Sequence, residues 1–177
     1  LYGAGSSSSS KLNNIHFNNL KIISSGVAST QYGIYLKYCN YLSNNVDIDI
    51  TGALSSSSNN YGWYLEESGS NSRSTDIQLK GGSAASKNVG ILLKKSNINF
   101  YDSNINVQGS STANYGIETT EETSENNLLQ LFSGKIFAPG TSGTNNSILN
   151  GSTVTKYMCI LNGIELNGET EDNSLSG

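Results

Sequence analysis

The sequence predicts an all-β protein, a right-handed parallel β-helix (a solenoid) of about six coils. The first observation behind this prediction is a Tyr-Gly pattern that recurs every 26–31 residues along the 177-residue chain. The second is that short stretches of alternating apolar and polar residues follow it within each period, as in half-buried strands. A helical solenoid is the alternative at this repeat length. It is disfavoured because no stretch keeps a 3.6-residue period, and Ser, Asn and Gly would break helices.

The first strand of each coil carries the Tyr-Gly pattern. Degraded copies begin at Tyr2 and Asn146, and the clear copies are Tyr32-Gly33-Ile34-Tyr35-Leu36, Tyr61-Gly62-Trp63-Tyr64-Leu65, Val89-Gly90-Ile91-Leu92-Leu93 and Tyr115-Gly116-Ile117-Glu118-Thr119. Side chains alternate between the two faces of a strand. We therefore expect Tyr32 and Ile34 to face the interior and Tyr35 to face outward.

The rest of each coil contains a variable polar segment, a second apolar stretch and a third strand. Small polar pairs, which tolerate the backbone of a tight turn, separate the last two. These pairs are Asn18-Asn19, Asn44-Asn45, Ser74-Thr75, Ser103-Asn104, Ser133-Gly134 and Asn162-Gly163. The third strands are expected at residues 20–22, 46–50, 76–79, 105–107, 136–138 and 164–166.

Charged residues support the same register. Aligned on the Tyr-Gly pattern, one column contains Lys37, Glu66 and Lys94, and the next contains Glu67, Lys95 and Glu121. The sign of the charge alternates from coil to coil, so that neighbouring strands attract. The acidic piece from Glu118 to Glu125 is expected to be a solvated loop rather than a metal site.

The composition narrows the classes of function. The net charge is −4 with 14 % charged residues and no basic patch, so nucleic acid is not an expected partner. No apolar run approaches the roughly 18 residues of a membrane-spanning helix.

Cys39 and Cys159 lie four coils apart, about 19 Å at the usual strand spacing, and are expected to be buried thiols rather than a disulfide. We expect residues 1–177 to be a single β-helix segment of a longer protein, because the chain begins inside a repeat.

A Ser/Thr/Asn-rich corner followed by Tyr-Gly resembles a known family of repeats. The corner is clearest in Ser57-Ser58-Asn59-Asn60-Tyr61-Gly62 and Thr112-Ala113-Asn114-Tyr115-Gly116. These segments resemble the right-handed β-helix repeats of bacterial cell-surface proteins, which include spirochaete surface lipoproteins and the wider pectate-lyase-like superfamily. The resemblance implies the fold and an extracellular or cell-surface location. It does not select a function, because the superfamily holds lyases, hydrolases, tailspikes and adhesins.

Three carboxylates are the candidates for catalysis. If Val46 and Ile48 face inward, Asp47 and Asp49 face outward, and the next coil places Asp76 beside Asp47. Carboxylates on neighbouring strands lie at about the separation that the two catalytic carboxyl groups of a glycosidase have. The polysaccharide-degrading relatives that the resemblance suggests also carry a His-Gly element and an Arg-x-Lys element, or an arginine base beside Ca²⁺. His16 and Arg73, the single histidine and arginine of the chain, stand in no such motif.

An aromatic stripe is the candidate binding surface. Tyr35, Tyr64 and Leu92 occupy the same outward column in successive coils, where aromatic faces can stack on sugars. The opposing interpretation is that a loop or a neighbouring chain covers the stripe. The sequence favours a structural or adhesive module without a cofactor or metal, and the alternative is a glycoside hydrolase or lyase. The expected partners are a glycan or a host-surface or matrix ligand, and further copies of the chain associated through uncapped coil ends.

Overall fold

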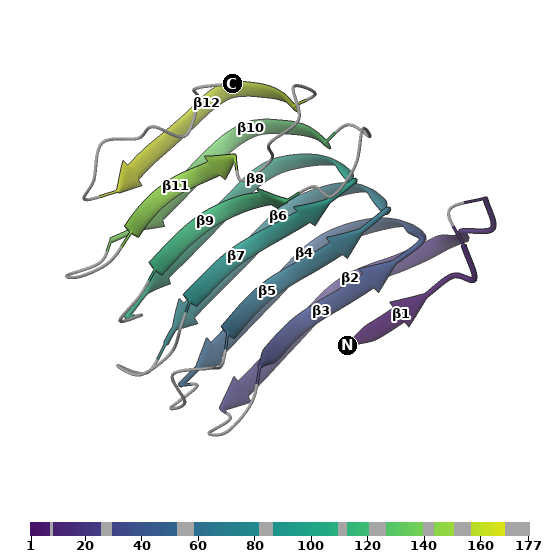
Figure 1. Ribbon diagram of the computed structural model, residues 1–177, viewed down its shortest axis with the longest axis horizontal. Helices are drawn as coiled ribbons and strands as arrows, with labels where there is room; N and C mark the ends of the chain where they lie inside the picture. Colours follow the sequence, from purple (N-terminus) through teal and green to yellow (C-terminus); the bar gives the residue numbers. More distant parts are fainter. Residues whose placement is uncertain are drawn as a thin grey trace.

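The computed structural model describes residues 1–7, 9–25, 30–52, 59–81, 87–109, 113–120, 127–139, 144–150 and 157–168. Within them the chain forms twelve β-strands and no helix (Figure 1). The strands of the first sheet are β1 (Tyr2–Ala4), β3 (Gln31–Lys37), β5 (Asn59–Glu66), β7 (Lys87–Lys94), β9 (Ala113–Thr120) and β11 (Thr144–Asn150). The strands of the second are β2 (Leu12–Ser25), β4 (Cys39–Thr51), β6 (Gly69–Lys80), β8 (Asn97–Gln108), β10 (Asn127–Ala138) and β12 (Tyr157–Gly168). We call these the tyrosine sheet and the long sheet.

The two sheets form a parallel β-solenoid, as the repeat predicts. Odd-numbered strands pair only with odd-numbered strands and even with even, always in parallel, so that each coil adds one strand to each sheet. Figure 1 shows the tyrosine sheet in front of the long sheet. About four turns have a neighbouring coil on both sides, and the predicted six also count the end coils β1–β2 and β11–β12.

The six strands of the long sheet share one bend, at a residue in the left-handed backbone conformation. The second and third predicted strands of a coil are therefore the two halves of one bent strand. The residues at the bend are Asn19, Asn45, Ser74, Asp102, Ser133 and Gly163. Five of the six predicted polar pairs contain the bend. The fourth prediction, Ser103-Asn104, was wrong by one residue, because Asp102 has a φ of 50° and Ser103 is already buried in the following half-strand.

The core lies between the two sheets and consists of stacked columns of apolar side chains. Ile48, Ile77 and Ile105 form one such column on the long sheet, and each is at most 2 % exposed. Trp63 of the tyrosine sheet is fully buried, and its ring lies 4.8 Å from the ring of Tyr41. Burial of this apolar area is the main stabilising contribution to such a fold.

The glycine of the Tyr-Gly pattern faces the core, which corrects the predicted orientation of Tyr32. A Cβ atom on Gly33 would lie 2.7 Å from the carbonyl oxygen of Gly62 and 2.7 Å from Cγ2 of Ile48. Because both Gly33 and Ile34 take inward positions, Tyr32 and Tyr35 both face outward. Tyr32 is 40 % exposed. The glycine is required because no side chain fits between two coils and the opposite sheet.

The first strand also has a register that differs from the prediction. Tyr2 pairs with Tyr35, not with Tyr32, and Gly3 pairs with Leu36. The first copy of the pattern is therefore shifted by three residues along its neighbour.

A buried ladder of amide side chains runs through the tyrosine sheet, one position before the tyrosine of the pattern or before the residue that replaces it (Val89, Asn146). Asn60 donates to Asn88 (2.7 Å), Asn88 to Asn114 (3.1 Å) and Asn114 to Asn145 (2.8 Å). All four asparagines are at most 2 % exposed. Since a buried amide needs hydrogen-bond partners, the ladder allows polar side chains to be buried in the four coils from β5 to β11.

The cysteine prediction is confirmed for Cys39, which is a free thiol and fully buried. The side chain of Cys159 lies outside the described residues, but its backbone pairs with Leu129 at the far end of the solenoid from Cys39.

Candidate functional site

The outer face of the tyrosine sheet carries two columns of rings. Tyr2, Tyr35 and Tyr64 stack in one column, with ring centroids 4.9 and 4.7 Å apart. Tyr32 and Tyr61 stack in the second column at 5.2 Å. Rings of different columns meet edge to face, so the five tyrosines form one continuous aromatic cluster.

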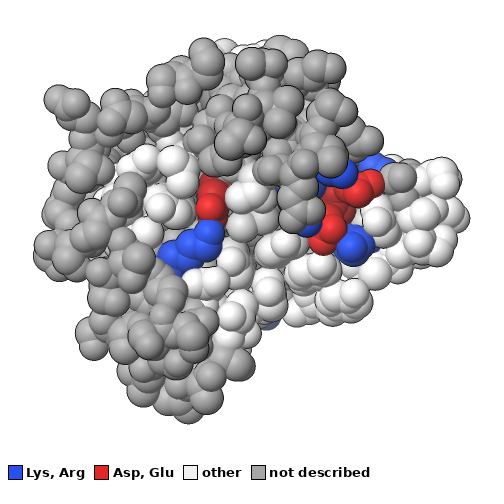
Figure 2. Space-filling model, viewed as in Figure 1, with Lys and Arg blue, Asp and Glu red and all other residues white. Residues whose placement is uncertain are grey.

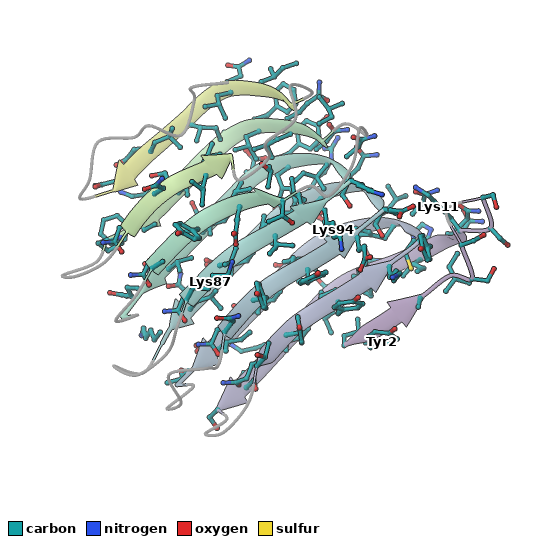
Figure 3. All side chains as sticks on the ribbon, viewed as in Figure 1. Tyr2, Lys11, Lys87 and Lys94 are labelled. Atoms are coloured by element: carbon teal, nitrogen blue, oxygen red, sulfur yellow. The ribbon has the colours of Figure 1, made fainter. Side chains whose placement is uncertain are left out.

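This stacking limits what the predicted stripe can bind. Tyr35 lies between the rings of Tyr2 and Tyr64, so both of its faces are occupied by protein. Leu92 continues the column beside Tyr64 but is only 4 % exposed. Within the described residues, the ring face that remains open in this column belongs to Tyr2, which is 70 % exposed and lies at the N-terminal end of the sheet (Figure 3). A binding role for Tyr35, Tyr64 and Leu92 stays a prediction, and their geometry is that of a packing ladder.

Next to the tyrosines, a charged cluster joins three coils at the C-terminal ends of strands β3, β5 and β7. Glu66 accepts a hydrogen bond from Lys37 (3.0 Å) and another from the hydroxyl of Tyr35 (3.1 Å), and Lys94 lies 3.7 Å away. Lys95 pairs with Glu67 at 3.8 Å. These contacts confirm the charge alternation predicted from the sequence, and Figure 2 shows the cluster as the larger group of red and blue atoms. The predicted contribution of Glu121 lies outside the described residues.

Burial and charge act on the ionisation of this cluster in opposite directions. Burial alone would raise the pKa of Glu66, but hydrogen bonds from Lys37 and Tyr35 and the charge of Lys94 outweigh it, so the pKa is lowered. Burial, together with the negative charge of Glu66, raises the pKa of Tyr35 well above its usual value. At neutral pH the cluster therefore contains an ionised Glu66 and a neutral Tyr35 that donates to it.

We expect Glu66→Gln to lower the free energy of unfolding at pH 7 by about 1–2 kcal/mol, because charge-assisted hydrogen bonds are lost. A carboxyl group whose pKa is lowered by folding stabilises the protein above its ordinary pKa. That stabilisation disappears as the pH falls through the lowered value. Urea unfolding from pH 7 down to pH 3 should therefore show wild type and variant converging under acidic conditions.

The matched control is Glu165→Gln. Its pair with Lys135 (2.8 Å) joins side chains that are 61 % and 44 % exposed, so we expect a change below about 0.5 kcal/mol. A Glu66→Gln variant that keeps the same deficit at pH 3 as at pH 7 would contradict the role assigned to this carboxylate.

A second, separate ion pair lies on the same outer face (Figure 2). Glu118 is 6 % exposed and both of its oxygens accept hydrogen bonds from Lys87, at 2.8 and 2.7 Å. The sequence placed Glu118 both in the Tyr-Gly strand and at the start of a solvated acidic loop; the strand is confirmed, and the loop was wrong for this residue. Glu118 is a buried residue of β9, and its partner is Lys87 of the neighbouring strand β7. Lys87 and Lys94 mark the two ends of β7 in Figure 3.

The three candidate carboxylates lie on the outer face of the long sheet. Asp47 and Asp76 are direct neighbours on β4 and β6, as predicted, and Asp49 lies beside Gln78. Asp47 is bound to Lys21 at 2.9 Å, and Asp76 accepts a hydrogen bond from Gln78 at 3.1 Å. Within the described residues, no group of three or more His, Cys, Asp or Glu side chains is arranged to hold a metal ion. A catalytic role for the three aspartates stays a prediction.

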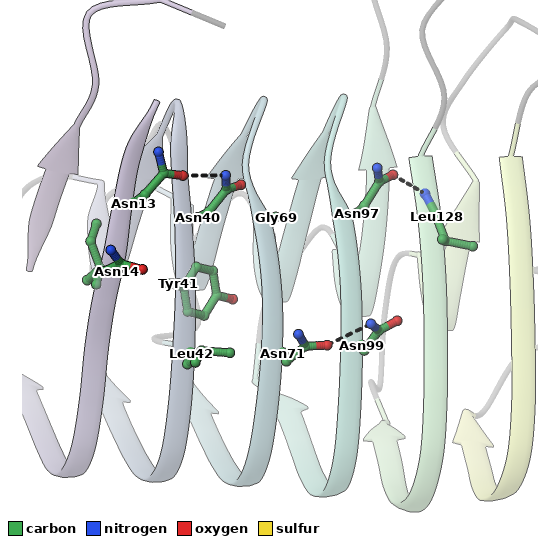
Figure 4. A pocket seen from close by; sticks show the side chains of 11 residues that line it. Asn13, Asn14, Asn40, Tyr41, Leu42, Gly69, Asn71, Asn97, Asn99 and Leu128 are labelled. Carbon is green, nitrogen blue, oxygen red and sulfur yellow. Dashed lines mark hydrogen bonds between the residues drawn. The ribbon is translucent and has the colours of Figure 1, made fainter. Parts of the chain in front are cut away.

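A groove of about 370 Å³ lies on the first half of the long sheet, before the bend. Its walls come from β2, β4, β6 and β8, with Leu128 of β10 at one end. Asparagines dominate its lining: Asn13, Asn14, Asn40, Asn71, Asn97 and Asn99. Figure 4 shows two amide pairs held between neighbouring strands, Asn40 to Asn13 (2.7 Å) and Asn99 to Asn71 (2.7 Å). We call it the amide groove.

Gly69 forms the open centre of the amide groove. It occupies the position between Asn40 and Asn97 on adjacent strands, where a side chain would otherwise fill the space (Figure 4). The Oδ1 atom of Asn40 lies only 3.0 Å from where a Cβ on Gly69 would be, so this acceptor borders the gap. On the other side, Oδ1 of Asn97 accepts a hydrogen bond from the backbone N–H of Leu128 at 3.1 Å. That bond holds the Asn97 amide in a fixed orientation.

The sequence interpretation missed the amide groove. Its signal is the recurrence of asparagine at whole-coil spacings: Asn13 and Asn40 one coil apart, Asn97 two coils after Asn40, and Asn71 and Asn99 one coil apart. In an asparagine-rich chain these positions do not differ from solvated loop residues until the strand register is known.

Comparisons with protein-family models, with curated proteins and with solved structures found no match to this chain. The parallel β-solenoid is therefore established by the strand pairing, and the finer resemblance to pectate-lyase-like or spirochaete surface proteins stays a prediction. In the described part of the chain there is no helix of the length and hydrophobicity that crossing a membrane requires.

Proposed function

We propose that this chain is a non-catalytic binding module of a surface-exposed or secreted protein, and that its amide groove holds an uncharged glycan. The observation that carries the proposal is the row of oriented amides on either side of Gly69. An extracellular or cell-surface location is part of the same proposal and is supported by the resemblance of the repeats to those of bacterial surface proteins.

The chemistry of the groove supports a neutral, hydroxyl-rich ligand. An amide side chain offers both donors and acceptors. It can therefore donate a hydrogen bond to a hydroxyl oxygen or accept one from the hydroxyl hydrogen. No charged side chain lines the groove, which disfavours acidic polysaccharides. Leu42, 46 % exposed, adds an apolar patch beside the amides for the C–H face of a sugar ring. Asn40 and Asn97 lie two strands apart, about 10 Å, which accommodates one sugar ring between them.

The enzyme alternative has less support from the geometry. Asp47, Asp49 and Asp76 lie beyond the bend and line no part of the amide groove. Lys21 neutralises Asp47 in an exposed ion pair. General acid catalysis by a carboxyl group requires a raised pKa, which burial in an apolar site usually provides. The exposed outer face does not provide such a site.

The proposal is tested by filling the groove. Gly69→Ile places a branched side chain between the amides; its Cβ would lie 3.0 Å from Oδ1 of Asn40 and 3.9 Å, an ordinary contact, from the backbone oxygen of Asn97. On an array of neutral and acidic polysaccharides, wild type should bind a neutral glycan. The variant should bind it at least about tenfold more weakly, equivalent to the loss of one or two hydrogen bonds.

The matched control is the double substitution Asp47→Ala and Asp76→Ala, which leaves the groove intact. Its glycan affinity should equal that of wild type, and neither protein should release reducing ends from the bound glycan. Circular dichroism establishes that both variants are folded. The proposal fails if wild type binds no neutral glycan, or if Gly69→Ile binds as well as wild type. Glycan cleavage that disappears in the aspartate variant would instead favour the enzyme alternative.

A further inference from the structure

The long sheet ends at β2 with a strand of 14 residues whose outer edge has no partner among the described strands. Ile15, Phe17, Leu20 and Ile22 of this strand pack against the core but remain partly exposed. On the tyrosine sheet, β1 covers the end with only three residues. A long edge strand with apolar side chains is a template for pairing with another chain.

The opposite end of the long sheet has the same character. β12, 12 residues long, pairs with β10 on one side and with no described strand on the other. Leu161, Ile164 and Leu166 are partly buried against the core from this end. Among the described strands, both ends of the long sheet therefore have an edge without a partner, next to partly exposed apolar side chains.

The two ends match each other residue by residue. Following the strand pairing through the long sheet, the column of Phe17 ends in Leu161, the column of Leu20 in Ile164 and the column of Ile22 in Leu166. The bends coincide too, because Asn19 and Gly163 occupy the same column and have φ values of 50° and 66°. A strand that follows β12 in this register therefore has the shape and apolar pattern of β2.

Charge complementarity supports the same docking. Lys21 and Glu165 are the first and last residues of one outward column, and each already pairs within the chain, Lys21 with Asp47 and Lys135 with Glu165. In the docked pair, this column would contain Lys135 and Glu165 of one molecule followed by Lys21 and Asp47 of the next. The sign of the charge would alternate at every step. Lys21 and Glu165 are 62 % and 61 % exposed, so both are accessible to a second molecule.

We propose that a second copy of this chain docks head to tail, with β12 of one molecule pairing in parallel with β2 of the next. This inference does not rest on glycan binding: the amide groove includes Asn13 and Asn14 of β2, but its centre at Gly69 lies two strands from the docking edge. The contact joins two different surfaces, so it does not close into a dimer. It leads to linear assemblies whose length grows with concentration.

The experiment measures the assembly of the full 177-residue chain by sedimentation velocity over a range of concentrations. Lys21→Glu and Glu165→Lys each place like charges at the junction, and each should weaken assembly about tenfold relative to wild type. An equimolar mixture of the two variants restores opposite charges at every mixed junction, and it should assemble better than either variant alone. Circular dichroism of the separate variants establishes that they are folded.

Two outcomes would overturn the inference. One is a wild-type chain that stays monomeric up to its solubility limit. The other is assembly that responds equally to both charge reversals and to their mixture, which would locate the contact elsewhere. Gly69→Ile, in the side wall, should assemble like wild type, which separates this test from the test of glycan binding.

Discussion

Gly90→Ala is expected to destabilise the solenoid by about 3 kcal/mol, at the upper end of the cost of overpacking a core. The added Cβ would lie 2.4 Å from the carbonyl oxygen of Gly116 and 2.4 Å from Cγ2 of Ile105. The carbonyl belongs to the backbone of the next coil, so it cannot rotate away as a flexible side chain can. Either β7 and β9 separate or the two sheets move apart. Urea unfolding should show a midpoint lower by roughly 1–2 M.

Gly3→Ala is the matched control for this prediction. The nearest atom to its added Cβ is a methyl group of Leu36 at 3.1 Å, which can move by a small rotation. We expect a change below about 1 kcal/mol, within the range of tolerated substitutions. Equal losses in the two variants would show that the cost comes from the conformational preference of glycine and not from the contact between coils.

Asn88→Ala is expected to cost about 3 kcal/mol through the buried amide ladder. Asn88 accepts a hydrogen bond from Asn60 and donates to Asn114 and to the carbonyl oxygen of Gln108, at 2.7, 3.1 and 3.2 Å. Its side chain is fully buried, so water cannot replace these bonds without opening the core. Each buried polar group that loses its partner costs about 1–3 kcal/mol. The measurement is the free energy of unfolding in urea.

Asn99→Ala tests whether burial is the reason. Asn99, half-buried on the outer face, forms a comparable amide pair at 2.7 Å with Asn71, whose side chain is exposed. There water can bond to the remaining amide, and we expect a loss below about 1 kcal/mol. If Asn99→Ala destabilised the chain as much as Asn88→Ala, burial of the ladder would not explain its contribution.

The sequence predicts the stacking of coils well because stacking repeats. Lys37, Glu66 and Lys94 recur at fixed spacing, and their contacts in the structure confirm the register that this spacing predicts. The orientation of Tyr32 was not predicted correctly, because the alternation rule assumes a regular strand. Gly33 interrupts that alternation by taking an inward position without a side chain. A glycine in a strand gives no sign in the sequence of which face it occupies.

The candidate sites were harder to predict than the fold. The adjacency of Asp47 and Asp76 follows from the register alone, but their exposed surroundings do not. The amide groove depends on the absence of a side chain at Gly69 between two strands that carry asparagine. Such a site arises from the relation between three coils, and a single strand of the sequence contains only one part of it.

The parallel pairing of every strand with its counterpart one coil away has a consequence for how such a chain can change in length. Each coil makes its main contacts only with the coils before and after it, so stability is close to a sum of nearest-neighbour terms. The asparagine ladder from Asn60 to Asn145 repeats one hydrogen bond from coil to coil, and the glycines from Gly33 to Gly116 repeat one close approach between coils. A whole coil is therefore the natural unit of duplication or loss, because its removal brings together two surfaces that already match.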